Sequence, residues 1–125
     1  WVEIVILLDS NTIIYLSKKL IKIDDILEDN TIPLVSVVTY MEVLGYDFKD
    51  DSEKNFIKKL FSFLEIVYID EEIAIKTIKI REENKIKLPD AIICATALYK
   101  KAKLITNDEK LSFLYDKMIE QKSFK

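Results

Sequence analysis

The chain has 125 residues, of which 50% are hydrophobic and 33% are charged, and its formal net charge is −3. This length and composition predict one compact globular domain over residues 1–125 and exclude a disordered or repetitive protein. The longest uncharged run, residues 31–41, is shorter than the roughly 20 residues of a membrane-spanning helix. A single cysteine fits a reducing, cytoplasmic compartment. The absence of histidine excludes the usual general base and most zinc sites.

The first half of the chain predicts strands alternating with helices. The apolar run Ile4–Leu8 is typical of a strand buried on both faces of a parallel sheet. A helix is expected to start near Asn11, with Ser10 or Asn11 as its cap. The other predicted elements are a short helix at Asp24–Leu27, a strand at Pro33–Ser36, a helix at Thr39–Tyr46, and a helix capped by Asp51-Ser52 with Phe56, Ile57, Leu60, Phe61 and Leu64 on its apolar face.

The second half continues this alternation. Ile66–Ile69 predicts a third strand, and Leu104–Ile105 predicts a fourth. Between them we expect a helix over Glu71–Ile86 and a helix that begins at Pro89, where the missing N–H costs nothing. The tail from Lys110 to Lys125 starts as a helix. In the helix predicted over Glu71–Ile86, we expect Ile73, Thr77 and Ile80 to point inward. Such alternation predicts an α/β domain with a mainly parallel sheet.

Four acidic residues lie in or beside these apolar segments. Asp9 directly follows the first strand and Asp108 lies three residues past the fourth, so both belong to the carboxyl edge of the sheet, where ligands bind. Glu42 and Asp90 lie on mostly apolar helix faces and are expected to point toward the sheet. A carboxylate near a core needs a compensating charge, and oxygen ligands alone favour magnesium or manganese. The sequence therefore predicts a metal site.

Three of the four acids also have a structural explanation. Asp9 could simply cap the following helix, and Asp108 could be a turn residue. Asp90, in a first helical turn, could serve only the helix dipole. Glu42, in the middle of a helix, has no such explanation.

The apolar surroundings of Cys94 favour core packing over reactivity.

Four segments in this order and spacing resemble the PIN-domain ribonucleases, most closely the toxin subunit of VapBC toxin–antitoxin pairs. The segments are Leu8–Asn11, Ser36–Glu42, Leu88–Ala97 and Leu104–Asp108. The resemblance implies a three-layer α/β/α sandwich with a four- or five-stranded parallel sheet. One small departure is Cys94, which stands where such proteins commonly have alanine.

The resemblance also implies an activity. It implies endonucleolytic cleavage of RNA by water activated by one or two Mg²⁺ or Mn²⁺ ions. Asp9, Glu42, Asp90 and Asp108 match the acidic quartet of the family, with Asn11 and Thr106 as supporting residues. The implied partners are a small antitoxin protein and a second copy of the chain.

Two alternative functions stay open on the sequence alone. One is a stand-alone PIN nuclease in RNA processing, and the other is a non-catalytic binding module on the same fold. For a nuclease, Arg81 and Lys87 are the best candidates for contacts with the RNA phosphates, because they approach Asp90 in the sequence.

Overall fold

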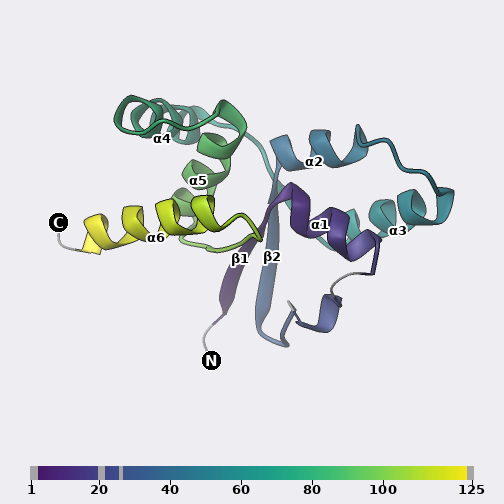
Figure 1. The fold of residues 1–125 in the computed structure, drawn as a ribbon. Coiled ribbons are helices and arrows are strands. Elements are labelled where there is room, and N and C mark those ends of the chain that lie inside the picture. The colour runs from purple at the N-terminus through teal and green to yellow at the C-terminus, as the bar shows by residue number, and fades with distance from the viewer. Residues whose placement is uncertain (1–2, 20–21, 26, 124–125) are drawn as a thin grey trace.

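A computed structural model describes residues 3–19, 22–25 and 27–123, and its centre is a four-stranded sheet (Figure 1). The strand order is β3-β2-β1-β4. Every pair is parallel, and the first and last strands of the chain lie side by side. Leu8 is level with Val35 on one side and with Ile105 on the other, so three carboxyl ends meet at one edge. The strands are β1 (Ile4–Leu8), β2 (Thr31–Ser36), β3 (Glu65–Val67) and β4 (Lys103–Ile105).

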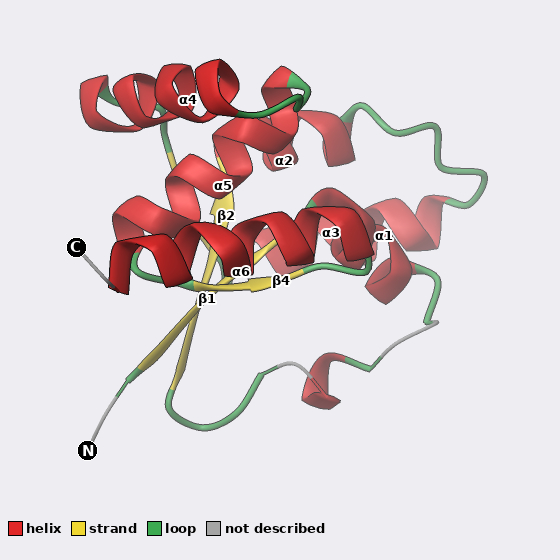
Figure 2. Ribbon diagram, turned by 60° about the vertical axis from the view of Figure 1, so that its left-hand side comes forward, coloured by secondary structure: helices red, strands yellow, loops and turns green. Residues whose placement is uncertain are grey.

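Helices cover both faces of this sheet, as Figures 1 and 2 show. One layer holds α1 (Ser10–Ser17), α2 (Val37–Leu44) and α3 (Asp51–Phe61), with the 3₁₀ turn η1 (Ile23–Asp25) nearby. The other layer holds α4 (Glu71–Glu83), α5 (Leu88–Lys100) and α6 (Glu109–Ser123). The predicted α/β/α sandwich is therefore confirmed, with four strands. In the described part of the chain, no helix combines the length and apolar character needed to cross a membrane.

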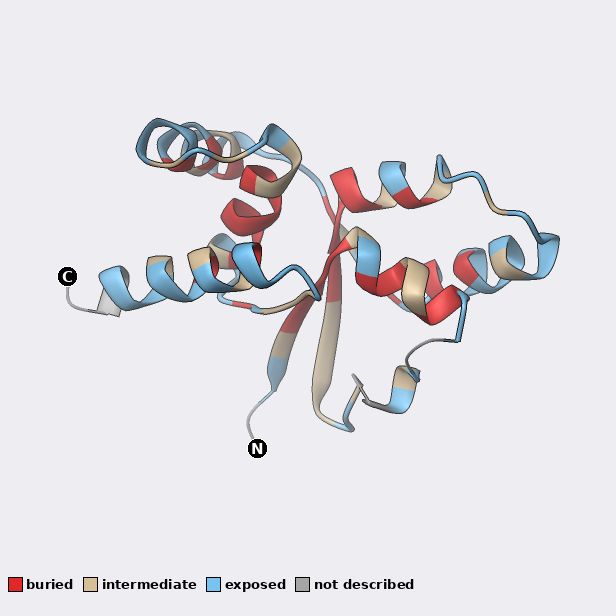
Figure 3. Cartoon of the chain, in the orientation of Figure 1, coloured by how far each residue is buried: buried red, intermediate tan, exposed pale blue. Residues whose placement is uncertain are grey.

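Two hydrophobic cores follow from the alternation of side chains along the strands. Ile6 and Leu8 of β1 point to the α1–α3 layer, while Leu7 points to the α4–α6 layer. Buried residues accordingly line both sides of the strands in Figure 3. Small residues on α5 let this helix lie close to the sheet, and Cys94 is one of them, as predicted. Burial raises the pKa of the Cys94 thiol to about 12, so the thiol stays protonated and unreactive at neutral pH.

Most predicted elements are present, but several boundaries were wrong. Asp9, rather than Ser10 or Asn11, caps α1 by accepting the Thr12 N–H. Asp50 caps α3 in place of the predicted Asp51-Ser52, and it does so through the N–H of Ser52. In both cases the acid before the expected residue has the extended backbone that a cap requires.

Other corrections concern the ends and faces of elements. The helix predicted to reach Ile86 ends at Glu83, because the Asn84 side chain donates to the Ile80 carbonyl and the backbone becomes extended. Strand β3 ends at Val67, before the exposed Tyr68 and Ile69. Phe56 is exposed, whereas the other four predicted residues of the α3 core face are buried. Ile26 of the predicted short helix, and residues 124–125 of the tail, lie outside the described residues.

Candidate active site

Asp9 is the most buried of the four acids, with 4% of its surface exposed. Oδ1 accepts the backbone N–H of Thr12 at 2.9 Å, which caps α1. Oδ2 accepts a hydrogen bond from the hydroxyl of Thr106, the residue that follows β4. The backbone N–H of Asp9 donates to the Ile105 carbonyl at 3.2 Å. Asp9 is therefore fixed between the first and last strands of the chain.

Thr106 also joins Asp9 to Asp108. Its Oγ1 accepts the backbone N–H of Asp108 at 3.0 Å while donating to Asp9. The Asp108 Oδ1 atom in turn accepts the N–H of Leu111 at 3.1 Å, in the first turn of α6. Asp108 is thus an exposed helix cap. The Thr106 hydroxyl links its backbone N–H to the carboxylate of the buried Asp9.

Glu42 approaches from α2, and here one expectation was wrong. Its side chain is exposed rather than directed into the sheet, because the α2 positions that face the core are Val38, Thr39 and Val43. The Ser10 hydroxyl, at the start of α1, donates to Glu42 Oε1 at 2.7 Å. This hydrogen bond holds the Glu42 side chain next to Ser10, and therefore near Asp9 in the chain.

Asp90 is half-buried in the first turn of α5 and accepts no hydrogen bond from the residues that the structure describes. Its pKa is raised above the usual value, first by burial. The negative charges of Asp108, Glu42 and Asp9 raise this pKa further, and the Lys87 ammonium lowers it. The other three carboxylates therefore lie near enough to act on the charge of Asp90, at the carboxyl edge of a parallel sheet.

Sequence reasoning missed two hydroxyl groups that build this arrangement. Ser10 was considered only as a helix cap, yet it holds Glu42. Thr12 Oγ1 donates to the Ile105 carbonyl at 3.1 Å, which ties α1 to the end of β4. Both bonds join segments far apart in the sequence, so no local pattern indicates them. Asn11, predicted as a supporting residue, is exposed in the first turn of α1.

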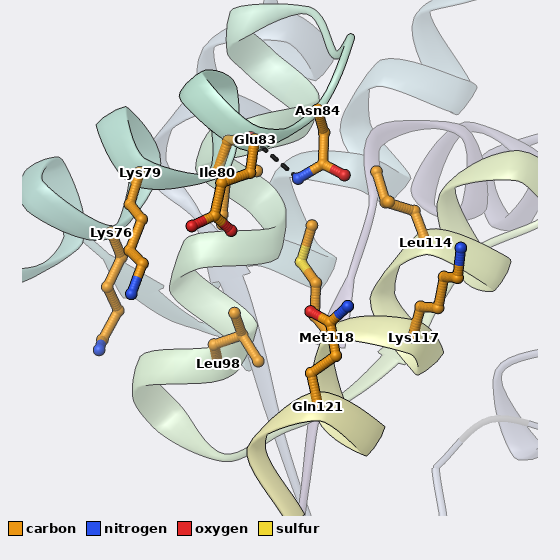
Figure 4. A pocket seen from close by; sticks show the side chains of 10 residues that line it. All are labelled: Lys76, Lys79, Ile80, Glu83, Asn84, Leu98, Leu114, Lys117, Met118 and Gln121. Carbon is orange, nitrogen blue, oxygen red and sulfur yellow. Dashed lines mark hydrogen bonds between the residues drawn. The ribbon is translucent and has the colours of Figure 1, made fainter. Parts of the chain in front are cut away.

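Hollows elsewhere on the surface contain none of the four acids. A pocket of about 340 Å³ lies between α4, α5 and α6, and Figure 4 shows Lys76 and Lys79 on one side of it and Lys117 on the other. A second hollow lies beside β4 and α6. The acidic site lies elsewhere, at the carboxyl edge of the sheet.

The comparison with protein families identifies the chain. The family model described as PIN domain matches residues 6–117. This chain belongs to the PIN domain family. PIN domains are generally nucleases. A comparison with curated proteins found no match.

Solved structures agree with this PIN domain assignment. A toxin–antitoxin complex from Klebsiella pneumoniae includes a chain 30% identical to this one; the match covers 84% of this chain and 88% of that one, with a TM-score of 0.66. VapBC-1 from nontypeable Haemophilus influenzae is 28% identical over 91% of this chain and 93% of that one, with a TM-score of 0.71. VapBC2 from Rickettsia felis, bound to a promoter DNA fragment, shares the fold at 20% identity, covering 89% and 93%, with a TM-score of 0.76.

PIN nucleases generally use divalent metals, and the donor set here fits such an ion in chemistry. All four candidate ligands are carboxylates, the donors that hard cations prefer. Burial and then the three neighbouring carboxylates raise the pKa of Asp90, while Lys87 lowers it, and a bound cation would favour the ionised form of this carboxyl. Among the described residues, however, no three acidic, cysteine or histidine side chains are gathered closely enough to hold an ion. The PIN site thus matches a divalent metal in charge and ligand type, but its carboxylates are spread apart.

Proposed function

We propose that this PIN domain is a metal-dependent endoribonuclease and the toxin of a type II toxin–antitoxin pair. The observation that carries the catalytic part is that the charges of Asp9, Glu42 and Asp108 all act on Asp90, in a chain with no histidine. Phosphodiester hydrolysis needs an activated nucleophile and stabilisation of charge on the phosphoryl oxygens. A bound Mg²⁺ or Mn²⁺ supplies both. Asp9, Glu42, Asp90 and Asp108 are the residues that would hold one or two such ions.

The hydrogen bonds around the site support distinct roles for the acids. Asp9 is fixed on both oxygens, so it provides a rigid reference point at the end of β1. Glu42 and Asp108 are exposed and lie where an RNA backbone can reach them. Asp90 has no competing hydrogen bond in the described structure, so its carboxylate is available as a ligand.

Positive charge near the acids is sparse. Lys87 directly precedes α5, is exposed, and acts on the Asp90 carboxyl electrostatically. It is therefore the better candidate for a contact with the RNA phosphate. Arg81 is exposed on the last turn of α4 and does not contribute to the pKa of Asp90. We retain both as proposed substrate contacts, with Lys87 nearer to the acidic site.

The toxin assignment rests on the relatives. The structures described above include a toxin–antitoxin complex and two VapBC complexes. A toxin of this kind works with a small antitoxin protein, so we expect one encoded beside this chain. Co-production of the neighbouring small reading frame should suppress RNA cleavage. Cleavage that no neighbouring product suppresses would favour a stand-alone RNA-processing nuclease.

The catalytic proposal is tested by incubating structured RNAs with the protein in Mn²⁺, Mg²⁺ or EDTA. Asp90→Asn is the informative variant, because the described structure gives Asp90 no hydrogen bond whose loss could disturb the fold. Asp116→Asn, an exposed acid on α6, is the matched control. We expect discrete, EDTA-sensitive fragments that disappear with Asp90→Asn and persist with Asp116→Asn. No cleavage and no calorimetric metal binding would favour the non-catalytic module.

A further inference from the structure

The pocket between α4, α5 and α6 is built from two helix faces. On α4 its lining residues follow the spacing i, i+3, i+4 and i+7, and so do those on α6, so each set forms one continuous face. Both helices pack against α5, and Figure 4 shows Leu98 of α5 between the two faces. The α4 face consists of Lys76, Lys79, Ile80 and Glu83, and the α6 face of Leu114, Lys117, Met118 and Gln121.

These two faces leave a space with an apolar floor. Helices that pack against each other normally present apolar residues at such spacings, but most of the positions here are polar or charged. Leu98, Leu114 and Met118 remain only half-buried, so their apolar surface is accessible to a ligand. The volume of about 340 Å³ lies within the range of small-molecule sites, which combine an apolar lining with a few polar groups.

Positive charge is in excess around this floor. Three lysines line the pocket against a single acid, Glu83, although the chain as a whole has a net charge of −3. Within the part of the chain that the structure describes, none of these four side chains has an ion pair. A ligand of the pocket should therefore carry negative charge.

We propose that this pocket binds a purine nucleoside diphosphate. A purine ring covers the apolar floor, and side-chain amides such as those of Asn84 and Gln121 recognise the donors and acceptors on its edge. A carboxylate such as that of Glu83 accepts hydrogen bonds from ribose hydroxyls. Lysine ammonium groups bind phosphates as mobile point charges. Each part of the nucleotide thus has a matching group in the lining.

The positions of these groups give the nucleotide a direction. Glu83 lies one turn after Lys79 on α4, so a ribose held by Glu83 places the phosphates beside Lys79 and Lys76. The purine ring then lies toward Asn84 and the α6 face. The Asn84 amide nitrogen donates to the Ile80 carbonyl at 3.0 Å, which holds this side chain in place and leaves its oxygen to accept from a purine amino group.

A fatty acid anion matches this lining less well. Its hydrocarbon chain would cover the floor and its carboxylate would bind a lysine. Glu83, however, would repel that carboxylate, and the amides of Asn84 and Gln121 would have no partner in the ligand. The mixture of acid, amide and lysine side chains therefore favours the nucleotide.

The pocket is separate from the acidic site. Leu98 lies eight residues after Asp90 on α5, which is about 12 Å along the helix, and Met118 lies ten residues after Asp108, or about 15 Å. Nucleotide binding at this distance needs neither the proposed metal ion nor nuclease activity. It can therefore be measured in EDTA, and its outcome does not depend on the proposed function.

The first test is calorimetric titration in EDTA at low ionic strength, with ADP, GDP, adenosine, pyrophosphate and decanoate. One equivalent of ADP or GDP should bind, about tenfold or more tightly than adenosine or pyrophosphate, because each fragment uses only part of the pocket. The preferred nucleotide should also raise the melting temperature. No binding of either nucleotide, equal affinity for pyrophosphate, or tighter binding of decanoate would overturn the proposal.

Three variants locate the site. Lys79→Glu should weaken binding about tenfold or more, whereas Lys58→Glu, the same charge reversal at an exposed position of α3 in the other layer, should leave it unchanged. The wild type should bind the preferred nucleotide more tightly than its 2′,3′-dideoxy form, and Glu83→Ala should remove this difference. Circular dichroism establishes that each variant is folded. Equal effects of the two lysine variants, or a sugar preference that survives Glu83→Ala, would refute the assignment.

Discussion

Replacing Thr106 by valine should destabilise the protein and impair the proposed nuclease together. The Thr106 hydroxyl donates to Oδ2 of the buried Asp9 and accepts the N–H of the exposed Asp108. Valine has nearly the same shape but no hydroxyl, so both bonds are lost without a large cavity. Water can replace the bond to the Asp108 N–H. It cannot easily reach Asp9, which is 4% exposed.

The size of the effect follows from the lost bond to a charged group. Such a hydrogen bond contributes about 1.5–3 kcal/mol, so we expect the free energy of unfolding to fall by about 2 kcal/mol. For a chain of 125 residues the entropy of unfolding is about 0.26 kcal/mol/K. The melting temperature should therefore fall by roughly 8 °C. A loosened Asp9 should also lower the cleavage rate about 10- to 100-fold, as is typical when a group supporting a metal ligand is removed.

Calorimetry and chemical denaturation at neutral pH measure the first effect, and metal-dependent RNA cleavage measures the second. Thr106→Ser is the matched control, because serine keeps the hydroxyl and loses only the methyl group. Its melting temperature and activity should stay close to those of the wild type. Thr106→Val and Thr106→Ser variants with equal stability would show that the hydroxyl does not anchor Asp9, and the reasoning would fail.

Three further predictions concern the same region and its surroundings. Asp90→Asn should raise stability at neutral pH in metal-free buffer: the raised pKa means that the ionised form destabilises the fold as pH rises above 3.8, so the gain should vanish in more acidic buffer. Denaturation curves from pH 3 to pH 8 would show this, and a gain independent of pH would contradict it. Ser10→Ala should release Glu42 and lower cleavage about 10-fold, with Ser10→Thr restoring it and thermal stability nearly unchanged. Cys94, with a pKa of about 12, should resist iodoacetamide at pH 8 until the protein is unfolded, which mass spectrometry would detect; labelling of the native protein would show that the thiol is accessible.

The layers of the fold could be read from the sequence because they depend on local periodicity. The run Ile4–Leu8 is apolar at every position, as a central parallel strand requires, and β1 has those bounds. The position of Asp9 after β1 then follows from topology alone. Its environment was less predictable: only the structure shows that Asp9 is both a helix cap and the acceptor of a hydrogen bond from Thr106, 97 residues away.

Side-chain direction was harder to predict than secondary structure. Glu42 interrupts an apolar segment, which indicated a buried position, yet α2 has only eight residues and its core contacts are made elsewhere on the helix. Phe56 was assigned to the core face of α3 by spacing, although Ile57 and Leu60 already fill that face. In both cases the sequence pattern predicted the helix correctly. Which of its side chains are buried depends on the elements that pack against the helix, and these are distant in the sequence.

The pairing of β4 with β1 has a consequence for the protein during its synthesis. The ribosome completes β1 and Asp9 near the beginning of the chain, but Thr106 and Asp108 about 100 residues later, roughly 5–20 s at common elongation rates. The site cannot assemble before β4 takes its place, because Asp9 and Asp90 depend on it for their last neighbours. For the proposed nuclease, a nascent chain is therefore harmless to its own messenger RNA. An inhibitory partner synthesised at the same time could therefore fold during this interval, before the nuclease becomes active.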